Sequence, residues 1–226
     1  MEPVDLIRIG SYVSVLGIMA TWELLAPRRK LTASKLCRWG GNLTIVVLNT
    51  VLARLLFMGG VVATAAMAQD RHWGLLNWVE GPVWLELALA IVALDFIIYW
   101  QHQVFHYMPI LWRFHMMHHS DLDLDVSSGV RFHPVEIIIS TGVKALSVLV
   151  LGVAPLAVVI FEIVLNSTAL FNHSNVRMPL ALDRVLRWFI VTPDMHRIHH
   201  STDVRETNSN YGFNVPWWDR LFGTYC

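Results

Sequence analysis

The chain has 226 residues, of which 55% are hydrophobic and only 15% charged, and its mean hydropathy is +0.49. A soluble domain carries about 25% charged residues, so the composition excludes an ordinary soluble fold and indicates a single membrane domain over 1–226. The net charge of zero gives no basis for nucleic-acid binding, and two distant cysteines, Cys37 and Cys226, favour neither a disulfide framework nor a cysteine zinc site.

The N-terminal part, 1–82, is predicted to hold transmembrane helices and their loops. An apolar run over 6–25 has about the length that crosses a bilayer, and no basic leader precedes it, so no cleavable signal peptide is predicted. Five positive charges within 28–38 indicate a cytoplasmic loop and an outer N-terminus. A second run, 43–68, predicts another crossing, in which Arg54 is expected to snorkel or face the bundle. The loop 69–82, with mixed charge and tryptophans, suits the outer interface.

A third apolar run, 83–100, leads directly into the first histidines. It returns the chain to the cytoplasmic side, where His102 and His106, four residues apart, share one helical face. Asp95 lies seven residues before His102 and projects from nearly the same face. An acid inside a membrane helix is costly, so Asp95 is expected either to orient a histidine or to make a structural hydrogen bond within the bundle.

Histidines recur at short spacing after a break at Met108-Pro109. The pattern HxxHH occurs twice, at His115, His118 and His119 and again at His196, His199 and His200. Imidazole is the commonest side-chain metal ligand, and these spacings gather several on adjacent helical faces. The recurrence favours a metal site over chance or general polarity.

A long apolar stretch separates the two HxxHH patterns. As one helix, 137–171 would be about 50 Å long, far more than a bilayer requires. Gly152 and Pro155 near its middle predict a break, and therefore a helical hairpin that enters and leaves on the same side. This hairpin returns His173 to the side where the first histidines lie.

Most charges outside the histidine patterns are expected to have structural roles. The spacing and glycine of an EF-hand are missing, so a solvated loop rather than a calcium site is predicted at Asp121, Asp123 and Asp125. Lys144 and Glu162 in the hairpin are expected to face the bundle or each other. Residues 182–191 have the spacing of an amphipathic helix at the membrane interface.

These runs predict an all-α integral-membrane bundle of about three transmembrane helices plus a helical hairpin, with a cytoplasmic histidine-rich helical cap. Nine histidines fall on the cytoplasmic side: His102, His106, His115, His118, His119, His173, His196, His199 and His200. One zinc takes about four ligands, so nine are about right for two ions. The HExxH motif of zinc proteases is absent, and imidazole suits iron, zinc and copper, so the ligand types leave the metal open.

The histidine boxes and the closing segments carry a resemblance to a known family. HQVFH, HMMHH and HRIHH match boxes of the form HxxxH, HxxHH and HxxHH in order, and TPDMHRIHHS, NYG and WDRLFGT are similar to the closing motifs. On these segments the chain resembles the fatty acid hydroxylase superfamily, also called the sterol desaturase family. The resemblance covers about 95–224 and marks 83–226 as the catalytic region, whereas 1–82 adds nothing specific.

The resemblance implies a non-haem di-iron membrane enzyme that uses O2 to hydroxylate or desaturate a lipid. It gives all nine histidines the role of metal ligands, although some relatives carry a further histidine where this chain has Ala169. His133 is a further candidate ligand or supporting residue. Asp95, Asp194 and Asp219 are candidates for hydrogen bonds to ligand imidazoles, and ordinary capping or salt-bridge roles stay open for Asp194 and Asp219. Two iron ions are implied, with zinc as a replacement in purified protein.

The same resemblance bears on partners and location. O2 is the implied co-substrate, and the electron donor is external, of ferredoxin or cytochrome type with a reductase, because no flavin, haem or Rossmann signature occurs. The implied location is a bacterial inner membrane or the endoplasmic reticulum, with the histidines on the cytoplasmic side.

Functions other than lipid hydroxylation are also compatible with the sequence. The boxes do not separate hydroxylation from desaturation, so a lipid desaturase or carotenoid hydroxylase stays open. A membrane metal transporter or sensor would hold its ligands near the bilayer midplane, whereas these lie at one end of the helices. A relative that binds metal only for stability is the last alternative.

Overall fold

The computed structural model describes residues 3–57, 59–78, 81–121 and 123–226. The described residues are helical with connecting loops, and the β-pairing among them is one isolated bridge between Pro27 and Val176. Five helical stretches are long and apolar enough to cross a membrane. The predicted all-α membrane bundle is confirmed.

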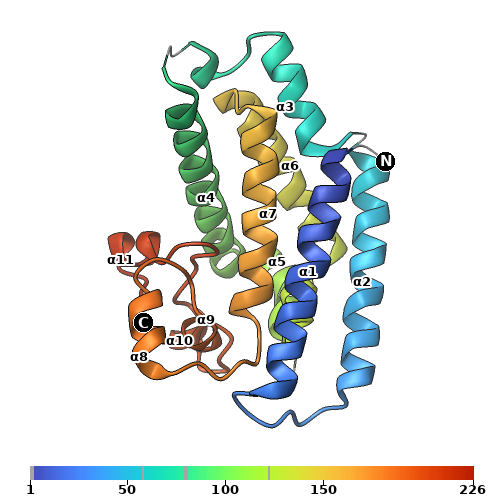
Figure 1. The fold of residues 1–226 in the computed structure, drawn as a ribbon, viewed down its shortest axis with the longest axis vertical. Helices are drawn as coiled ribbons and strands as arrows, with labels where there is room; N and C mark the ends of the chain where they lie inside the picture. Colours follow the sequence, from blue (N-terminus) through green and yellow to red (C-terminus); the bar gives the residue numbers. More distant parts are fainter. Residues whose placement is uncertain (1–2, 58, 79–80, 122) are drawn as a thin grey trace.

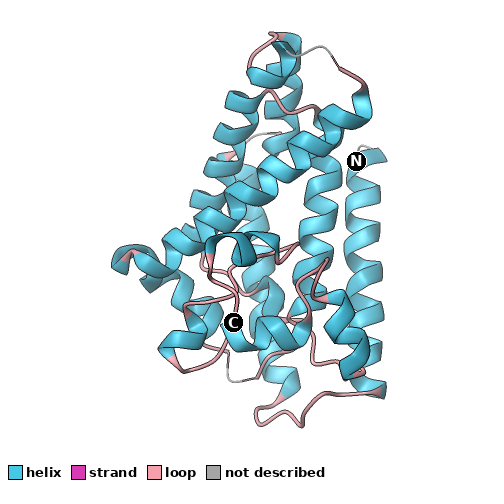
Figure 2. Cartoon of the chain, turned by 90° about the vertical axis from the view of Figure 1, so that its left-hand side faces the viewer, coloured by secondary structure: helices cyan, strands magenta, loops and turns pink. Residues whose placement is uncertain are grey.

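The long helices lie side by side, roughly along the long axis of the molecule, and the chain alternates in direction between them (Figures 1 and 2). α1 (Pro3–Leu25) descends along α7 (Pro155–Asn172), and α2 (Lys35–Leu56) returns beside it. α4 (Val83–Tyr107) descends on the opposite side of α7. The loop after α1 therefore lies at the same end of the bundle as the last turns of α4 and α7, the end that carries the histidines.

The crossing predicted over 43–68 lies within one apolar stretch, Lys35–Trp78, that is long enough to cross a membrane, but two helices rather than one form it. α2 ends at Leu56, and α3 (Gly60–Asp70) begins at Gly60 after its cap Gly59; both glycines have left-handed backbone angles, with φ of 81° and 68°. Left-handed residues cannot continue a right-handed helix, so the chain changes direction there. The 3₁₀ turn η1 (Leu75–Trp78) follows, and residues 79 and 80 of the loop expected at the outer interface lie outside the described residues.

The predicted hairpin is confirmed as α6 (Pro134–Leu151) followed by α7. Gly152 caps α6 with φ of 69°, and a Cβ there would stand 2.6 Å from the carbonyl oxygen of Trp73, so this turn requires glycine. Within the hairpin, Lys144 Nζ lies 3.4 Å from a Glu162 oxygen, and Arg8 of α1 also pairs with Glu162. The charges face each other inside the bundle, as predicted.

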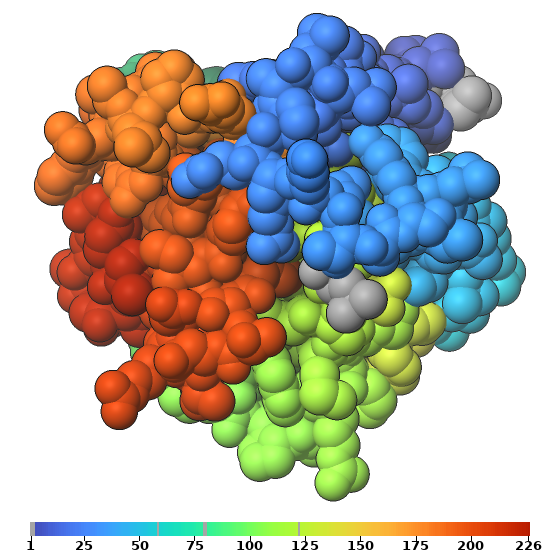
Figure 3. Space-filling model, turned by 90° about the horizontal axis from the view of Figure 1, so that it is seen from below, coloured from blue at the N-terminus to red at the C-terminus, as the bar shows by residue number. Residues whose placement is uncertain are grey.

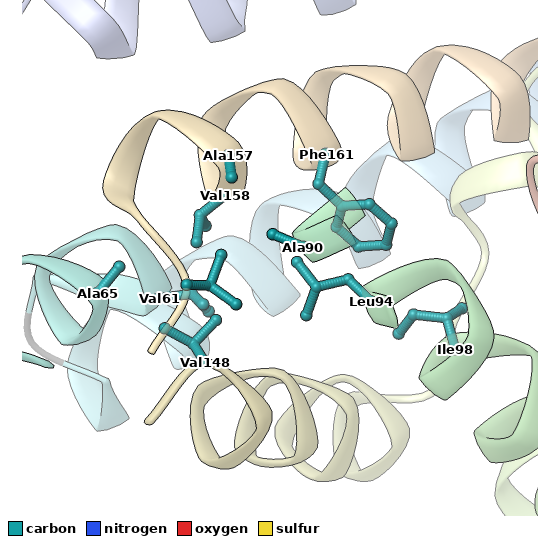
Figure 4. Packing of buried hydrophobic residues seen from close by; sticks show 10 residues of the cluster. Val61, Ala65, Ala90, Leu94, Ile98, Val148, Ala157, Val158 and Phe161 are labelled. Carbon is teal, nitrogen blue, oxygen red and sulfur yellow. The ribbon is translucent and has the colours of Figure 1, made fainter. Parts of the chain in front are cut away.

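A compact apolar core holds α3, α4, α6 and α7 together. Its ten buried residues are Val61, Ala65, Ala90, Leu94, Ile98, Val148, Val153, Ala157, Val158 and Phe161 (Figure 4). Burying each larger side chain contributes about 1.5–3 kcal/mol. One turn below Ile98 on α4 comes His102, so this core fixes the helix that presents the first histidines.

The loop after the first HxxHH pattern is buried over residues 123–129, so the solvated loop predicted there is wrong. Asp123 and Asp125 are 2% and 0% exposed. Arg38 of α2 donates from Nε to Asp121 and from Nη1 to Asp125, each over 2.6 Å, and the backbone N–H groups of Thr32 and Ala33 donate to Asp123. A buried arginine and backbone amides thus replace water around the three carboxylates.

Short helices gather at the lower end of the bundle, beside the lower turns of α1 and α2 (Figure 1). They are α5 (Pro109–His119), η2 (Ser128–Val130), α8 (Leu180–Leu186), α9 (Pro193–His199), α10 (Val204–Thr207) and α11 (Trp217–Phe222). α8 begins earlier and ends sooner than the amphipathic helix predicted over 182–191, and Leu182 and Val185 of α8 are exposed, as is Phe189 just after it. These helices, packed against the ends of α4 and α7, enclose the histidines.

Candidate metal centre

The nine predicted histidines lie in two groups. The five-histidine group contains His102, His106, His115, His119 and His199, and the four-histidine group contains His118, His173, His196 and His200. Within each group, one ring nitrogen from every member lies within 4.8 Å of the others. His119 and His200 are partly exposed and the other seven are buried.

Each HxxHH pattern divides between the groups because of helical geometry. In α5, His115 and His119 are four residues apart and point into the five-histidine group, while His118 points into the other. α9 does the reverse: His196 and His200 enter the four-histidine group, and His199 enters the five-histidine group. α4 completes the first group with two histidines, and His173, which caps α7, completes the second.

The Nε2 atoms converge at distances that suit a shared ion. In the five-histidine group the Nε2 atom of His102 lies 3.2 Å from that of His115 and 3.1 Å from that of His199. In the four-histidine group, His173 Nε2 is 3.0 Å from both His118 Nε2 and His196 Nε2. Two nitrogens bound at right angles to one ion, each about 2.1 Å from it, would stand about 3.0 Å apart. The donor sets therefore fit one metal ion in each group.

Hydrogen bonds at the opposite ring nitrogen determine which atom faces inward. Four Nδ1–H groups donate over 2.7 Å to protein oxygens: His102 to the Tyr211 carbonyl, His115 to Glu136 Oε1, His173 to the Ala169 carbonyl and His199 to the Ser209 carbonyl. In a neutral imidazole with its proton on Nδ1, the lone pair is on Nε2. These bonds thus fix the tautomer that a metal requires, as in known carboxylate– and carbonyl–histidine–metal arrangements.

Burial keeps these imidazoles uncharged. Loss of hydration, and then the neighbouring imidazoles, lower the pKa of His196 and of His199 well below the ordinary value, and burial lowers the pKa of His173 to about 4. A histidine must be deprotonated to bind a metal. The rings outside the membrane helices are therefore ready to act as ligands at neutral pH.

Glu136 is the residue at this site that the sequence patterns did not indicate. It lies in the first turn of α6, is 4% exposed, and accepts the Nδ1–H of His115. Its other oxygen is buried without a hydrogen-bond partner among the described residues. The available signal was an acid three residues after His133 at the start of an apolar helix, where an unpaired carboxylate would be costly.

The four additional candidates lie outside both groups. His133 caps α6, with Nδ1 accepting the N–H of Val135 at 3.1 Å. Asp95 accepts from Asn214 and Trp218, and Asp194 pairs with Arg28. Asp219 accepts the backbone N–H groups of Tyr211 and Gly212. Asp219 thus fixes the backbone at Tyr211, and the Tyr211 carbonyl in turn orients His102. In the described contacts Asp219 therefore acts on the site only indirectly.

The fold and these groups define an all-helical integral membrane protein with a histidine-rich candidate metal centre. The chain belongs to the fatty acid hydroxylase family, because the family model described as fatty acid hydroxylase matches residues 87–224. That match begins in α4 and ends after α11, so it contains all nine histidines.

Comparison with curated proteins gives several relatives. The chain is 31% identical to the ornithine lipid hydroxylase OlsE of Rhizobium tropici, over 95% of the chain and 65% of that protein. It is 29% identical to the alkylglycerol monooxygenase of Homo sapiens, over 77% of the chain and 38% of that protein. It is also 29% identical to the fatty acid hydroxylase vlmA of Lecanicillium sp, over 72% of the chain and 49% of that protein. The chain thus spans less than two thirds of each of these relatives. No solved structure gave a significant match.

Proposed function

We propose that this protein is an O2-dependent lipid hydroxylase with a histidine-ligated, non-haem di-iron centre. The observation that carries the proposal is the division of nine histidines into two convergent groups. Family membership supports the reaction class, and each of the three relatives is named as a hydroxylase or monooxygenase. Electrons would come from an external donor of ferredoxin or cytochrome type with its reductase.

In this proposal the five-histidine group holds one iron and the four-histidine group holds the other. When bound, the two irons would supply the activation of O2 for attack on an unactivated C–H bond. The protein's own residues orient the ligands, since Glu136 and three backbone carbonyls fix their rings. Seven buried imidazoles also keep bulk water away from the centre.

A substrate with a long apolar chain fits both the relatives and the bundle. The relatives' names refer to an ornithine lipid, an alkylglycerol and a fatty acid. The histidines lie at one end of helices that are apolar enough to cross a membrane, so a lipid would reach them laterally from the bilayer. The basic loop at that end supports a cytoplasmic location for the site.

The test compares wild-type protein with His118→Ala, which removes one ligand of the four-histidine group. Both are produced in cells grown under 18O2, and the lipids are compared by mass spectrometry. Hydroxylation predicts lipids that carry one 18O atom with wild type and not with His118→Ala at equal protein level. His72→Gln serves as the matched control, because His72 is exposed and lies beyond α3, outside both histidine groups.

Other outcomes of this experiment select other functions. Lipids that lose two hydrogens without gaining 18O would identify a desaturase and contradict hydroxylation. Unchanged lipids with wild type, in protein that holds about two irons per chain after anaerobic reconstitution, would favour a structural metal site. Zinc in aerobically purified protein is expected as a replacement, so iron is reloaded before metal content is measured.

A further inference from the structure

A basic pocket of about 420 Å³ lies at the end of α1, separate from the histidine groups. It is formed by the last turn of α1, the loop 26–34 and the first residue of α2, and Asn175 closes it. Figure 3 views this end of the molecule directly, and the blue segment after α1 lies on its surface against the orange segment that precedes α9. Three cationic side chains, Arg29, Lys30 and Lys35, line the pocket.

The charges of the pocket are not balanced. Glu23 is its one carboxylate, and its Oε1 accepts the backbone N–H groups of Val126 at 2.6 Å and Asn175 at 2.7 Å. Its Oε2 lies 3.5 Å from Lys35 Nζ. Among the described residues no carboxylate lies within 4.0 Å of the charged groups of Arg29 or Lys30, which are both exposed. Two positive charges therefore remain available to a ligand.

The pocket is preformed because the loop is fixed to the segment after His173. Pro27 pairs with Val176, and the backbone N–H of Arg28 donates to the Asn175 carbonyl at 2.8 Å. The Asn175 side chain accepts from the N–H of Arg29 and donates to its carbonyl. A loop held by four such contacts loses little further conformational entropy when it binds a ligand.

A partly buried arginine, Arg197, lies behind the loop and increases the local excess of positive charge. Arg197 of α9 has its Nε and Nη1 atoms buried without a partner among the described residues. An anion bound beside Arg29 would offset part of this excess positive charge.

The position of the pocket identifies the kind of anion. Leu24 and Leu25, at the end of a helix long enough to span a membrane, are 71% and 81% exposed. A separate shallow apolar furrow lies along α1 from Leu25 past Ile18 and Gly17, and Gly17 leaves it open because it has no Cβ. Basic residues at the end of an apolar membrane surface are the arrangement that binds anionic lipid headgroups.

We propose that this pocket binds the phosphate of an anionic phospholipid whose acyl chains lie along α1. Arg29 and Lys30 would contact the phosphate oxygens, with the guanidinium donating two hydrogen bonds to one phosphate. Because the same loop is fixed beside His173 and, through Arg28 and Asp194, to α9, the lipid would also stabilise the packing of the loop against the histidine-bearing segments.

The test measures lipid retention by the full chain in detergent with native mass spectrometry. Wild type is incubated with equal amounts of phosphatidylglycerol and phosphatidylcholine of the same chain length. We expect preferential retention of phosphatidylglycerol, and a roughly twenty- to thirty-fold loss of that preference in Arg29→Gln/Lys30→Gln, since each basic residue near the membrane contributes about fivefold. Both side chains are exposed, so the variant is expected to fold.

The matched control is Arg184→Gln/Arg205→Gln, which removes two exposed positive charges from α8 and α10 at the same end. It should retain the wild-type preference. Equal loss in the control, or no preference in wild type, would overturn the proposal. Binding of inorganic phosphate without retention of phospholipid would exclude a lipid as the ligand. If Arg29→Gln/Lys30→Gln kept its lipid but received electrons more slowly from a reduced donor protein, the two basic residues would bind the donor protein rather than a lipid, and the proposal would be wrong.

Discussion

At the scale of single residues, the bond from His115 to Glu136 determines which imidazole nitrogen faces the five-histidine group. We predict that Glu136→Ala weakens metal binding by roughly 10–100-fold, the usual cost of removing a partner that orients a ligand. Glu136→Gln should lose less, because its amide oxygen still accepts the Nδ1–H. Metal retained during dialysis against a chelator series measures both effects.

Glu206→Ala is the control for this prediction, since Glu206 is an exposed acid on α10 at the same end of the bundle. Circular dichroism of each variant would establish that the helices are intact. If Glu136→Ala retained metal as tightly as wild type, the carboxylate would have no role in orienting His115.

At the scale of elements, Arg38 joins α2 to the loop that follows the first HxxHH pattern. Arg38→Ala would leave Asp121 and Asp125 buried without their cation, and breaking such a pair costs about 3–5 kcal/mol. We expect Tm to fall by roughly 6 °C or more for a chain of this size. Thermal unfolding in detergent measures the change, with Arg54→Ala, an exposed arginine in the last turn of α2, as control. Equal Tm values for the two variants would contradict a stabilising role for Arg38.

The same contact shows how far the sequence predicts this structure. Local signals sufficed for the hairpin, because Gly152 and Pro155 interrupt a helix at their own positions. Helical spacing alone also places His118 on a different face from His115 and His119. The burial of Asp125 depends on Arg38, 87 positions earlier, and the role of Glu136 depends on a histidine in another helix. Periodicity and spacing carry no information about such contacts, which exist only after the helices have packed.

At the scale of the whole molecule, the two histidine groups connect otherwise separate parts of the chain. α5 and α9 each supply histidines to both groups, while α4 and the end of α7 supply the rest. Metal binding should therefore stabilise the docking of the short helices on the bundle. We predict that a chelator accelerates hydrogen exchange in α5 and α9, with little change in the core of α3, α6 and α7. Unchanged exchange in α9 after complete metal removal would contradict this cross-linking.

Acid should destabilise the metal-free protein, and the direction follows from the imidazoles outside the membrane helices. In the folded state, burial lowers the pKa of His173 to about 4 from an ordinary value of 6.5, and it lowers the pKa of His118 and of His196 well below that ordinary value. Below pH 6.5 the histidines of the unfolded chain become protonated, whereas these folded rings stay neutral. The free energy of unfolding therefore decreases as the pH is lowered. Each such ring contributes about 1.4 kcal/mol per pH unit down to its folded pKa.

Tm of the metal-free protein should therefore be lower at pH 5.5 than at pH 7.5, and thermal unfolding in the same detergent measures the difference. His196→Asn should reduce this pH dependence because it removes one ring that is held neutral. His72→Gln is the control and should leave the pH dependence unchanged, since His72 is exposed and lies outside both histidine groups. Equal Tm values at the two pH values would mean that the folded groups accept protons as readily as the unfolded chain, which is incompatible with nine histidines held neutral in preformed metal sites.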